Sequence, residues 1–288
     1  MPELPEVETV CRGLAPHLEG ARIETVTLNR PDLRFKFPDR FIDRLQGQEI
    51  QAINRRAKYI LVDLSGGETW LSHLGMTGNY RIVDNSSPFA PGKHDHVEVT
   101  LTHPRHGDST LLYSDPRRFG FMDMFADVAT CKYLANLGPE PLGNSFTATG
   151  LAQNFSSRRT PVKSALLDQR IIAGLGNIYV CEALWRASIS PMVPACNLVN
   201  EDGSPTPELG VLANVIRDVL IEAIAAGGST LQDFRNTKGN AGYFQHSFDV
   251  YGREGHDCHR ADCSGTIARI VQSGRSSFWC PTCQVETG

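Results

Sequence analysis

The runs ARIETVTL (residues 21–28) and KYILVDL (residues 58–64) decide the fold class of the N-terminal half. Both are short, rich in β-branched residues and patterned like half-buried strands. Three more runs share this texture: ETWLSHL (68–74), HVEVTL (96–101) and STLLYS (109–114). Because GG, PG, HG and DP pairs interrupt the region, its strands must be joined by tight turns. The region from about residue 22 to 125 therefore predicts a small antiparallel sandwich or barrel.

Helical spacing appears on both sides of this region. Val7, Val10 and Leu14 follow a Pro-Glu start at intervals of three and four, which predicts a helix beginning almost at the N-terminus. Residues 163–187 and 208–228 have the same periodicity with glycine punctuation, so the second domain should be helical. The expected fold is α+β with three domains: an N-terminal helix plus antiparallel β-sandwich (1–130), a helical domain (131–250) and a C-terminal hairpin (251–288).

Composition excludes several classes of protein. Of the residues, 41% are hydrophobic, but no run approaches the roughly 20 apolar residues that a membrane-spanning helix needs. The start, MPELPEVETV, lacks the basic region and apolar run of a secretory signal, so we expect a cytoplasmic protein with no membrane partner. The net charge of -4 is spread evenly, which excludes a nonspecific DNA coat. Nucleic-acid binding would require a local cationic face.

Four of the eight cysteines lie close together near the C-terminus. Cys258, Cys263, Cys280 and Cys283 have the spacing C-x4-C-x16-C-x2-C, with the β-like stretches TIARIV and SSFW between the two pairs. Four thiolates satisfy tetrahedral zinc and leave no open position, so the pattern predicts one structural Zn²⁺ that holds a β-hairpin. His259 stands beside the wider first pair and is an alternative to Cys258 as ligand.

Pro2 has two interpretations. Proline favours a first helical turn and acidic residues favour its positive end, so Pro2, Glu3 and Glu6 are explained without any function. Alternatively, removal of Met1 would expose a secondary amine with a pKa near ~8, part of which is unprotonated at neutral pH. Such an amine can attack a sugar carbon and form an iminium. Glu3 and Glu6, one turn apart, would then supply protons.

Eight motifs in order resemble the formamidopyrimidine-DNA glycosylase branch of the Fpg/Nei family of DNA glycosylases. They are PELPEVET (2–9), RRAKY (55–59), HLGMTG (73–78), KHDHV (93–97), DPRRFG (115–120), LGPEPL (137–142), GLGNIY (174–179) and the C-terminal cysteines. The resemblance spans nearly the whole chain and favours the catalytic interpretation of Pro2. It implies a helix-two-turn-helix element in the helical domain and a zinc finger at 251–288.

The resemblance implies a bifunctional glycosylase and abasic-site lyase of base excision repair, acting on 8-oxoguanine and formamidopyrimidines with no catalytic cofactor. Pro2 would be the Schiff-base nucleophile, Glu3 the proton donor that opens the sugar, and Glu6 its support. Lys58 would relay protons and hold phosphate, whereas Arg55 is expected to be a solvated strand residue. Arg275 is the family's donor for δ-elimination, but arginine stays charged, which favours a phosphate contact.

Chemistry on a stacked base requires extrusion of the nucleotide and something to fill the gap. Met76, Arg117 and Phe119 match the family's filling residues, and a guanidinium can bond the orphaned cytosine. A buried core residue is the alternative for Met76, but its place in the turn GMTG (75–78) between two strands favours an exposed tip. Further matched DNA contacts are His94, Arg158, Lys163 and Asn177; a solvated surface charge is the alternative for His94, Arg158 and Lys163. Residues 235–245, RNTKGNAGYFQ, are expected to form a mobile loop that covers the extruded base.

Two other functions compete with this one. An endonuclease VIII-like glycosylase would release oxidised pyrimidines, but the start PELPEV and the full set of Met76, Arg117 and Phe119 favour purines. A non-catalytic zinc-ribbon DNA-binding protein would leave Pro2 and Lys58 without a role. The expected partner is damaged double-stranded DNA. A monomer without an obligate protein partner follows from the resemblance alone.

Overall fold

The computed structural model describes residues 2–85, 89–229 and 244–285. The chain forms two compact units, the first made of residues 1–135 with 226–245 and the second of 136–225 with 246–288. The described residues 226–229 and 244–245 thus belong with the N-terminal unit although they follow the helices in sequence. Residues 235–243 of the expected covering loop lie outside the described residues. Among the described residues, no helix is long and apolar enough to cross a membrane.

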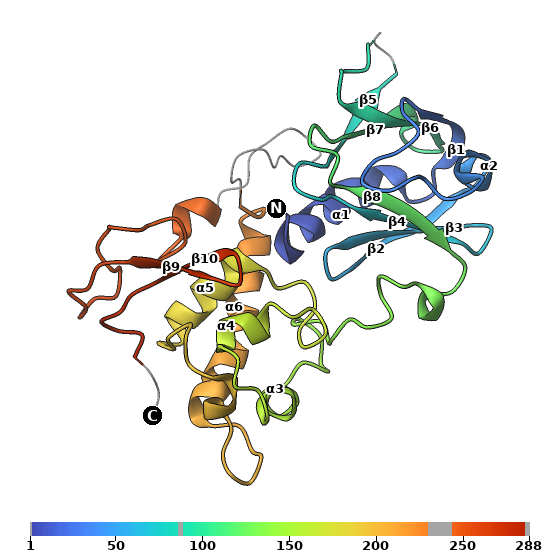
Figure 1. The fold of residues 1–288 in the computed structure, drawn as a ribbon. Helices are drawn as coiled ribbons and strands as arrows, with labels where there is room; N and C mark the ends of the chain where they lie inside the picture. The colour runs from blue at the N-terminus through green and yellow to red at the C-terminus, as the bar shows by residue number, and fades with distance from the viewer. Residues whose placement is uncertain (1, 86–88, 230–243, 286–288) are drawn as a thin grey trace. The chain divides into compact units, whose positions relative to one another are not determined.

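The first unit is a sandwich of two four-stranded antiparallel sheets with the orders β1-β6-β7-β5 and β2-β3-β4-β8. The labelled strands can be followed in Figure 1. The strands are β1 (Arg22–Leu28), β2 (Ile50–Arg56), β3 (Tyr59–Leu64), β4 (Thr69–His73), β5 (Asn79–Asp84), β6 (Asp95–His103), β7 (Gly107–Ser114) and β8 (Phe121–Phe125). Two short helices complete it, α2 (Phe41–Leu45) and η1 (Val128–Thr130). The predicted antiparallel sandwich is confirmed.

Helix α1 (Leu4–Leu18) packs against both sheets. Its apolar face, Val7, Val10, Leu14 and Leu18, is at most 1% exposed and joins the core formed by the inward-facing strand residues. Burial of such side chains contributes roughly 1.5–3 kcal/mol each. The helix is therefore rigidly placed, and its N-terminal residues are fixed relative to the sheets.

The second unit is helical with a terminal hairpin. Its elements are α3 (Ala148–Phe155), α4 (Val162–Leu166), α5 (Asn177–Arg186), η2 (Ala195–Leu198), α6 (Pro207–Ala225), β9 (Ala268–Gln272) and β10 (Arg275–Trp279); η3 (Phe244–Ser247) lies where the chain passes between the units. Helix α5 contacts α4, α6 and β10 and is buried along almost its whole length. The predicted helical domain and zinc hairpin are confirmed. The boundaries drawn at residues 130 and 250 stay a prediction.

Candidate active site and nucleic-acid interface

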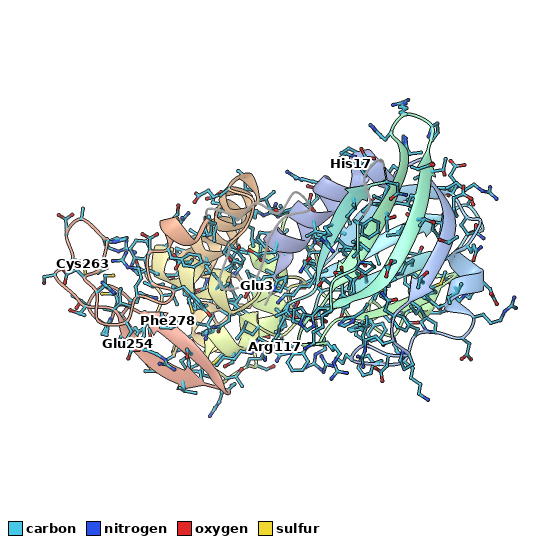
Figure 2. The ribbon with its side chains drawn as sticks, turned by 90° about the horizontal axis from the view of Figure 1, so that it is seen from above. Glu3, His17, Arg117, Glu254, Cys263 and Phe278 are labelled. Carbon is cyan, nitrogen blue, oxygen red and sulfur yellow. The ribbon has the colours of Figure 1, made fainter. Side chains whose placement is uncertain are left out.

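Pro2 and two glutamates occupy the beginning of α1, where Figure 2 labels Glu3. All three residues are buried. The Glu3 carboxylate accepts from the Glu6 N–H, and Glu6 Oε2 accepts from the Glu3 N–H at 2.8 Å. Glu6 Oε1 accepts the N–H and the hydroxyl of Ser229 at 2.7 and 3.0 Å. Two carboxylates are thus held within one helical turn of the predicted nucleophile, at the positive end of the helix dipole.

Lys58 lies in the two-residue turn between β2 and β3. Its neighbour Ala57 has a φ of 52°, as the hairpin turns that match strand twist require. Arg55 binds Glu8 of α1 at 2.9 Å and donates to the Ala57 carbonyl at 3.0 Å. The Arg55 side chain is only 10% exposed, so the expectation that Arg55 is a solvated strand residue is wrong. Arg55 instead ties the Lys58 turn to α1.

His73, at the end of β4, was not assigned a role from the sequence. Its ring stacks on Phe121, and burial, followed by the charges of Lys58 and Arg34, lowers its pKa to about 4. Nδ1 accepts the Gly75 N–H at 3.1 Å, which leaves the proton of the neutral ring on Nε2. The residue is therefore a neutral donor beside a lysine. The sequence feature that could have indicated a role for His73 is its position as the first residue of the motif HLGMTG.

Two loops cross between the sheets at the same edge. The Leu74–Gly78 turn joins β4 to β5, and the Asp115–Gly120 loop joins β7 to β8. Because β4 pairs with β8 and β5 pairs with β7, the two crossings must lie together. Sheet topology therefore brings together two motifs that are about 40 residues apart in the sequence.

These loops present the side chains predicted to fill the gap. Met76 is 36% exposed and Phe119 is 43% exposed, so both large apolar side chains reach the solvent. The Arg117 guanidinium, labelled in Figure 2, lies over the Phe119 ring at 4.9 Å from its centroid. Two exposed apolar side chains, Met76 and Phe119, thus lie on adjoining loops with the Arg117 cation over one of them, and this composition suits insertion into a base stack. We call Met76, Arg117 and Phe119 the wedge.

A cationic pocket beside the wedge was missed in the sequence. It has a volume of about 460 Å³ and is lined by Asp32, Leu33, Arg34, Arg117, Arg118 and Phe119. Arg34 lies over the ring of Phe35, which is 48% exposed, and the Arg34 N–H binds the Gly120 carbonyl at 3.0 Å. The local cationic face that a mildly acidic protein needs for nucleic acid is present here. The segment RPDLRFKFP (30–38), which carries Arg34, has no helical or strand periodicity, so the sequence does not predict that it lies beside the Arg117–Phe119 loop.

In the second unit, Asn177 begins α5 and its Nδ2 donates to the Ser276 carbonyl at 2.9 Å. This contact ties α5 to β10, whose first residue is the exposed Arg275. Lys163 is fully buried, and its Nζ donates to the Ser276 carbonyl at 3.1 Å and to Ser277 Oγ at 2.6 Å. The expected surface charge is therefore wrong, because the Lys163 ammonium supports β10, the strand that begins with Arg275. Its contact with DNA stays a prediction.

The remaining predicted contacts lie nearer the surface. Arg158 is 37% exposed and pairs with Asp168 at 3.8 Å. His94 is half-buried, and its carbonyl accepts the Asp115 N–H at 3.0 Å. Both residues stay predictions as DNA contacts.

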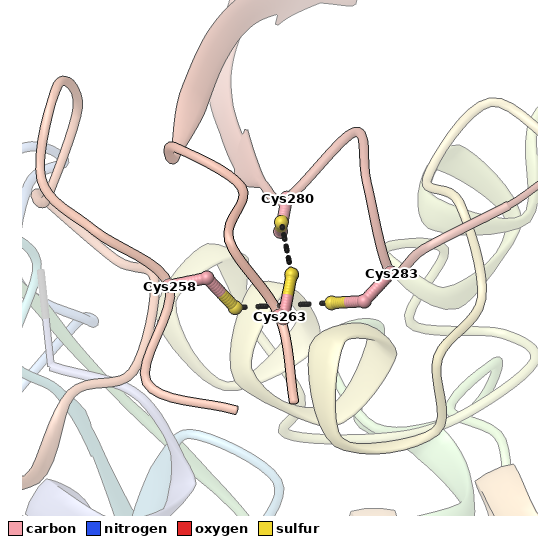
Figure 3. A group of neighbouring side chains, drawn as sticks. All are labelled: Cys258, Cys263, Cys280 and Cys283. Atoms are coloured by element: carbon pink, nitrogen blue, oxygen red, sulfur yellow. Dashed lines mark hydrogen bonds between the residues drawn. The ribbon is translucent and has the colours of Figure 1, made fainter. Parts of the chain in front are cut away.

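The four clustered cysteines fit zinc (Figure 3). Their sulfurs all lie within 4.8 Å of one another, and none is in a disulfide. Sγ–Sγ distances are 3.8 Å for Cys258–Cys283 and 3.6 Å for Cys263–Cys280. A tetrahedron with Zn–S bonds of about 2.3 Å has edges of about 3.8 Å, so the sulfurs are already spaced for the metal. The indole N–H of Trp185 donates to Cys258 Sγ at 3.3 Å, which favours a thiolate.

His259 does not replace Cys258. It is exposed and its Nδ1 lies 3.2 Å from Asp249 Oδ1, whereas Cys258 belongs to the sulfur cluster. The alternative ligand set is therefore excluded by the structure.

Three family models match the chain in order. They are described as the formamidopyrimidine-DNA glycosylase N-terminal domain (residues 1–122), the formamidopyrimidine-DNA glycosylase H2TH domain (137–235) and a zinc finger found in FPG and IleRS (255–285). The chain belongs to the formamidopyrimidine-DNA glycosylase family. The zinc-finger match and the sulfur geometry agree on a structural zinc.

Curated formamidopyrimidine-DNA glycosylases align along their full length. The one from Rhizobium johnstonii is 54% identical, covering 99% of this chain and all of the relative, and the one from Ruegeria pomeroyi is 55% identical with the same coverage. Among solved structures, MutM (FPG) from Thermus thermophilus has a TM-score of 0.83 at 38% identity over both full chains. A Lactococcus lactis FPG mutant in complex with a Fapy-dG containing DNA has a TM-score of 0.85 at 32% identity, covering 98% of this chain and 99% of that one. As a family member, this chain is a DNA glycosylase and abasic-site lyase of base excision repair.

Proposed function

We propose that this enzyme releases oxidised purines from duplex DNA through a Schiff base on Pro2. The observation that carries the proposal is the buried start of α1, where Glu3 and Glu6 lie within one turn of the proline. After removal of Met1, the Pro2 nitrogen attacks C1′ and the C1′–N bond to the base breaks. The ring-opened sugar is then joined to Pro2 as an iminium, whose positive charge acidifies the C2′ proton for β-elimination.

Glu3 is the proposed proton donor to the sugar ring oxygen. Glu6 supports it, because its carboxylate accepts the Glu3 N–H and two donors of Ser229 and so cannot turn away. Lys58 holds phosphate and relays a proton from its turn, with the neutral His73 nearby as a second donor. Arg275, on the zinc hairpin, contacts phosphate. No metal or organic cofactor takes part in these steps.

Duplex DNA is the proposed partner. A Lactococcus lactis Fpg has been solved with an abasic site containing DNA, and its chain is 32% identical to this one. Met76 and Phe119 would fill the gap left by the extruded nucleotide while Arg117 bonds the opposite cytosine. His94, Arg158 and Asn177 are the proposed phosphate contacts, with Lys163 acting through β10. A monomeric cytoplasmic enzyme without an obligate protein partner completes the proposal.

Borohydride trapping on a duplex containing 8-oxoguanine opposite cytosine tests the nucleophile. The expected result is a covalent adduct whose mass spectrum places the DNA on Pro2, with Met1 absent from the native protein. Glu3→Gln should slow base release at least 100-fold at nearly unchanged DNA affinity, since general acid catalysis contributes about 10²–10⁴-fold. Full activity of protein with an acetylated N-terminus would overturn the mechanism.

A second substrate decides between purines and pyrimidines. Release of 8-oxoguanine opposite cytosine should exceed release of thymine glycol opposite adenine when both duplexes are measured under single-turnover conditions. The reverse order would favour the endonuclease VIII-like activity.

A further inference from the structure

Asp115 is a buried carboxylate that the proposed chemistry does not use. It follows β7 and is 0% exposed. Oδ1 accepts the Thr77 hydroxyl at 2.5 Å, and Oδ2 accepts the Gly120 N–H at 2.8 Å and the Tyr113 hydroxyl at 3.4 Å. All three partners are donors, which suits a carboxylate acceptor. Burying a carboxylate without hydrogen bonds would cost several kcal/mol of folding free energy. The three bonds therefore explain how Asp115 can be buried.

Asp115 is bonded to both crossing loops at once. The Thr77 hydroxyl has a single proton, which it gives to Asp115, and its oxygen then accepts the Arg117 N–H at 3.1 Å. A relay therefore runs from Arg117 through Thr77 of the Met76 turn to Asp115. The Asp115 carbonyl also accepts the Arg118 N–H at 3.2 Å, next to Phe119.

The backbones of the two loops are in direct contact. A Cβ on Gly75 would lie 2.3 Å from the Gly120 nitrogen, and a Cβ on Gly120 would lie 1.8 Å from the Tyr113 hydroxyl oxygen. Gly75 has a φ of 61°, and Arg118 adopts a φ of 55° that non-glycine residues rarely take. Strained backbone persists only where the surroundings determine it. The hydrogen bonds of Asp115 belong to those surroundings, together with the bonds from the Gly75 N–H to His73 Nδ1 and from the Arg34 N–H to the Gly120 carbonyl.

We propose that Asp115 is a positioning residue that holds the Met76 turn and the Arg117–Phe119 loop together as one wedge. The inference rests on the proposed role of Met76, Arg117 and Phe119 in filling the DNA gap. Without the carboxylate the two loops move independently, and base extrusion slows. The chemistry on a nucleotide that has already lost its base is spared, because that substrate has no base to unstack.

The experiment compares Thr77→Val with Thr77→Ser, because both keep the loop and only serine keeps the hydroxyl. Thr77→Val should slow single-turnover release of 8-oxoguanine opposite cytosine about tenfold, the effect of one hydrogen bond to a charged group. It should leave strand cleavage at a preformed abasic site within about threefold of wild type, whereas Thr77→Ser should match wild type on both substrates. Asp115→Asn should show the same selective loss, and Asp63→Asn, which alters a carboxylate that bonds Asn54 and Thr69 elsewhere, should show none.

A second readout is specific to positioning. Because Arg117 is proposed to bond the opposite cytosine, Thr77→Val should reduce the preference for cytosine over adenine opposite the lesion. Equal rates for Thr77→Val and Thr77→Ser, or an equal loss on both substrates, would overturn the inference.

Met76→Ala and Phe119→Ala distinguish a failure of the proposed gap-filling role from a failure of the proposed positioning role of Asp115. If they excise 8-oxoguanine at the wild-type rate, the proposed wedge itself fails; if they are slow and Thr77→Val is not, only the role of Asp115 fails.

Discussion

Replacing Arg55 by methionine should loosen the Lys58 turn by about 2 kcal/mol. The substitution keeps an unbranched apolar stem and removes two hydrogen bonds, to Glu8 Oε2 at 2.9 Å and to the Ala57 carbonyl at 3.0 Å. A hydrogen bond to a charged group contributes about 1.5–3 kcal/mol. The Arg55 and Glu8 side chains are 10% and 21% exposed, so water still weakens their interaction. We therefore use the lower part of that range.

Glu8 sets the pH range in which this pair acts. Burial raises the pKa of Glu8, but the hydrogen bonds from Arg55 and then Arg12 outweigh burial and leave the pKa below its ordinary value of 4.5. The folded protein therefore holds the ionised form more strongly than the unfolded chain does. The stabilisation is complete well above pH 4.5 and is lost as the pH falls through the lowered pKa.

Hydrogen exchange measured by mass spectrometry at pH 7 tests the Arg55 prediction locally. Peptides that cover β2 and β3 should exchange about 30-fold faster in Arg55→Met, the equivalent of 2 kcal/mol. Peptides from α6, in the other unit, are an internal control and should not change. Glu8→Gln should produce a smaller effect, because it leaves the hydrogen bond from Arg55 to the Ala57 carbonyl, and the double variant should be no worse than Arg55→Met by more than about 0.5 kcal/mol. Unchanged exchange in β2 and β3 would show that the ion pair does not hold the turn.

Two further predictions concern pH and metal. Since the pKa of His73 is about 4 in the folded protein and 6.5 ordinarily, the unfolded chain gains a proton first as the pH falls. The free energy of unfolding should therefore drop by up to about 1.4 kcal/mol per pH unit between 6.5 and 4 relative to His73→Asn, as measured by urea denaturation; parallel pH profiles would contradict this. Removing zinc with a chelator, or replacing Cys280 by serine, should weaken DNA binding at least tenfold, because the strand that carries Arg275 loses its metal anchor. Undiminished affinity in a gel-shift titration would show that the hairpin is dispensable.

Much of the fold follows from local pattern. Val7, Val10 and Leu14 have the spacing of a helix and are buried on one face of α1. The cysteine spacing gave the zinc hairpin because the ligands are close in sequence. Exposure of Met76 could be predicted because it lies at a turn between two strands. In each case the deciding interactions lie within a few residues or within one motif.

The sequence did not predict the burial of three charged residues, Arg55, Lys163 and Asp115, and the physical cause is the same for each. Arg55 and Lys163 are charged residues that look solvated in sequence, yet each is neutralised or bonded by a group far along the chain. The partner of Arg55 is 47 residues away and that of Lys163 is 114 residues away. Asp115 was overlooked for the same reason, since Thr77 is 38 residues distant. Sequence patterns report local periodicity, but a buried ion is paired by tertiary structure.

Zinc held by the four clustered cysteines would make the enzyme depend on the reducing state of its surroundings. Cys263 and Cys283 are only partly covered, so small oxidants can reach thiolates that the metal requires. Oxidised sulfur no longer coordinates zinc. The oxidants that generate the lesions can thereby also release the metal, and repair capacity would fall when damage is heaviest unless thiols are regenerated.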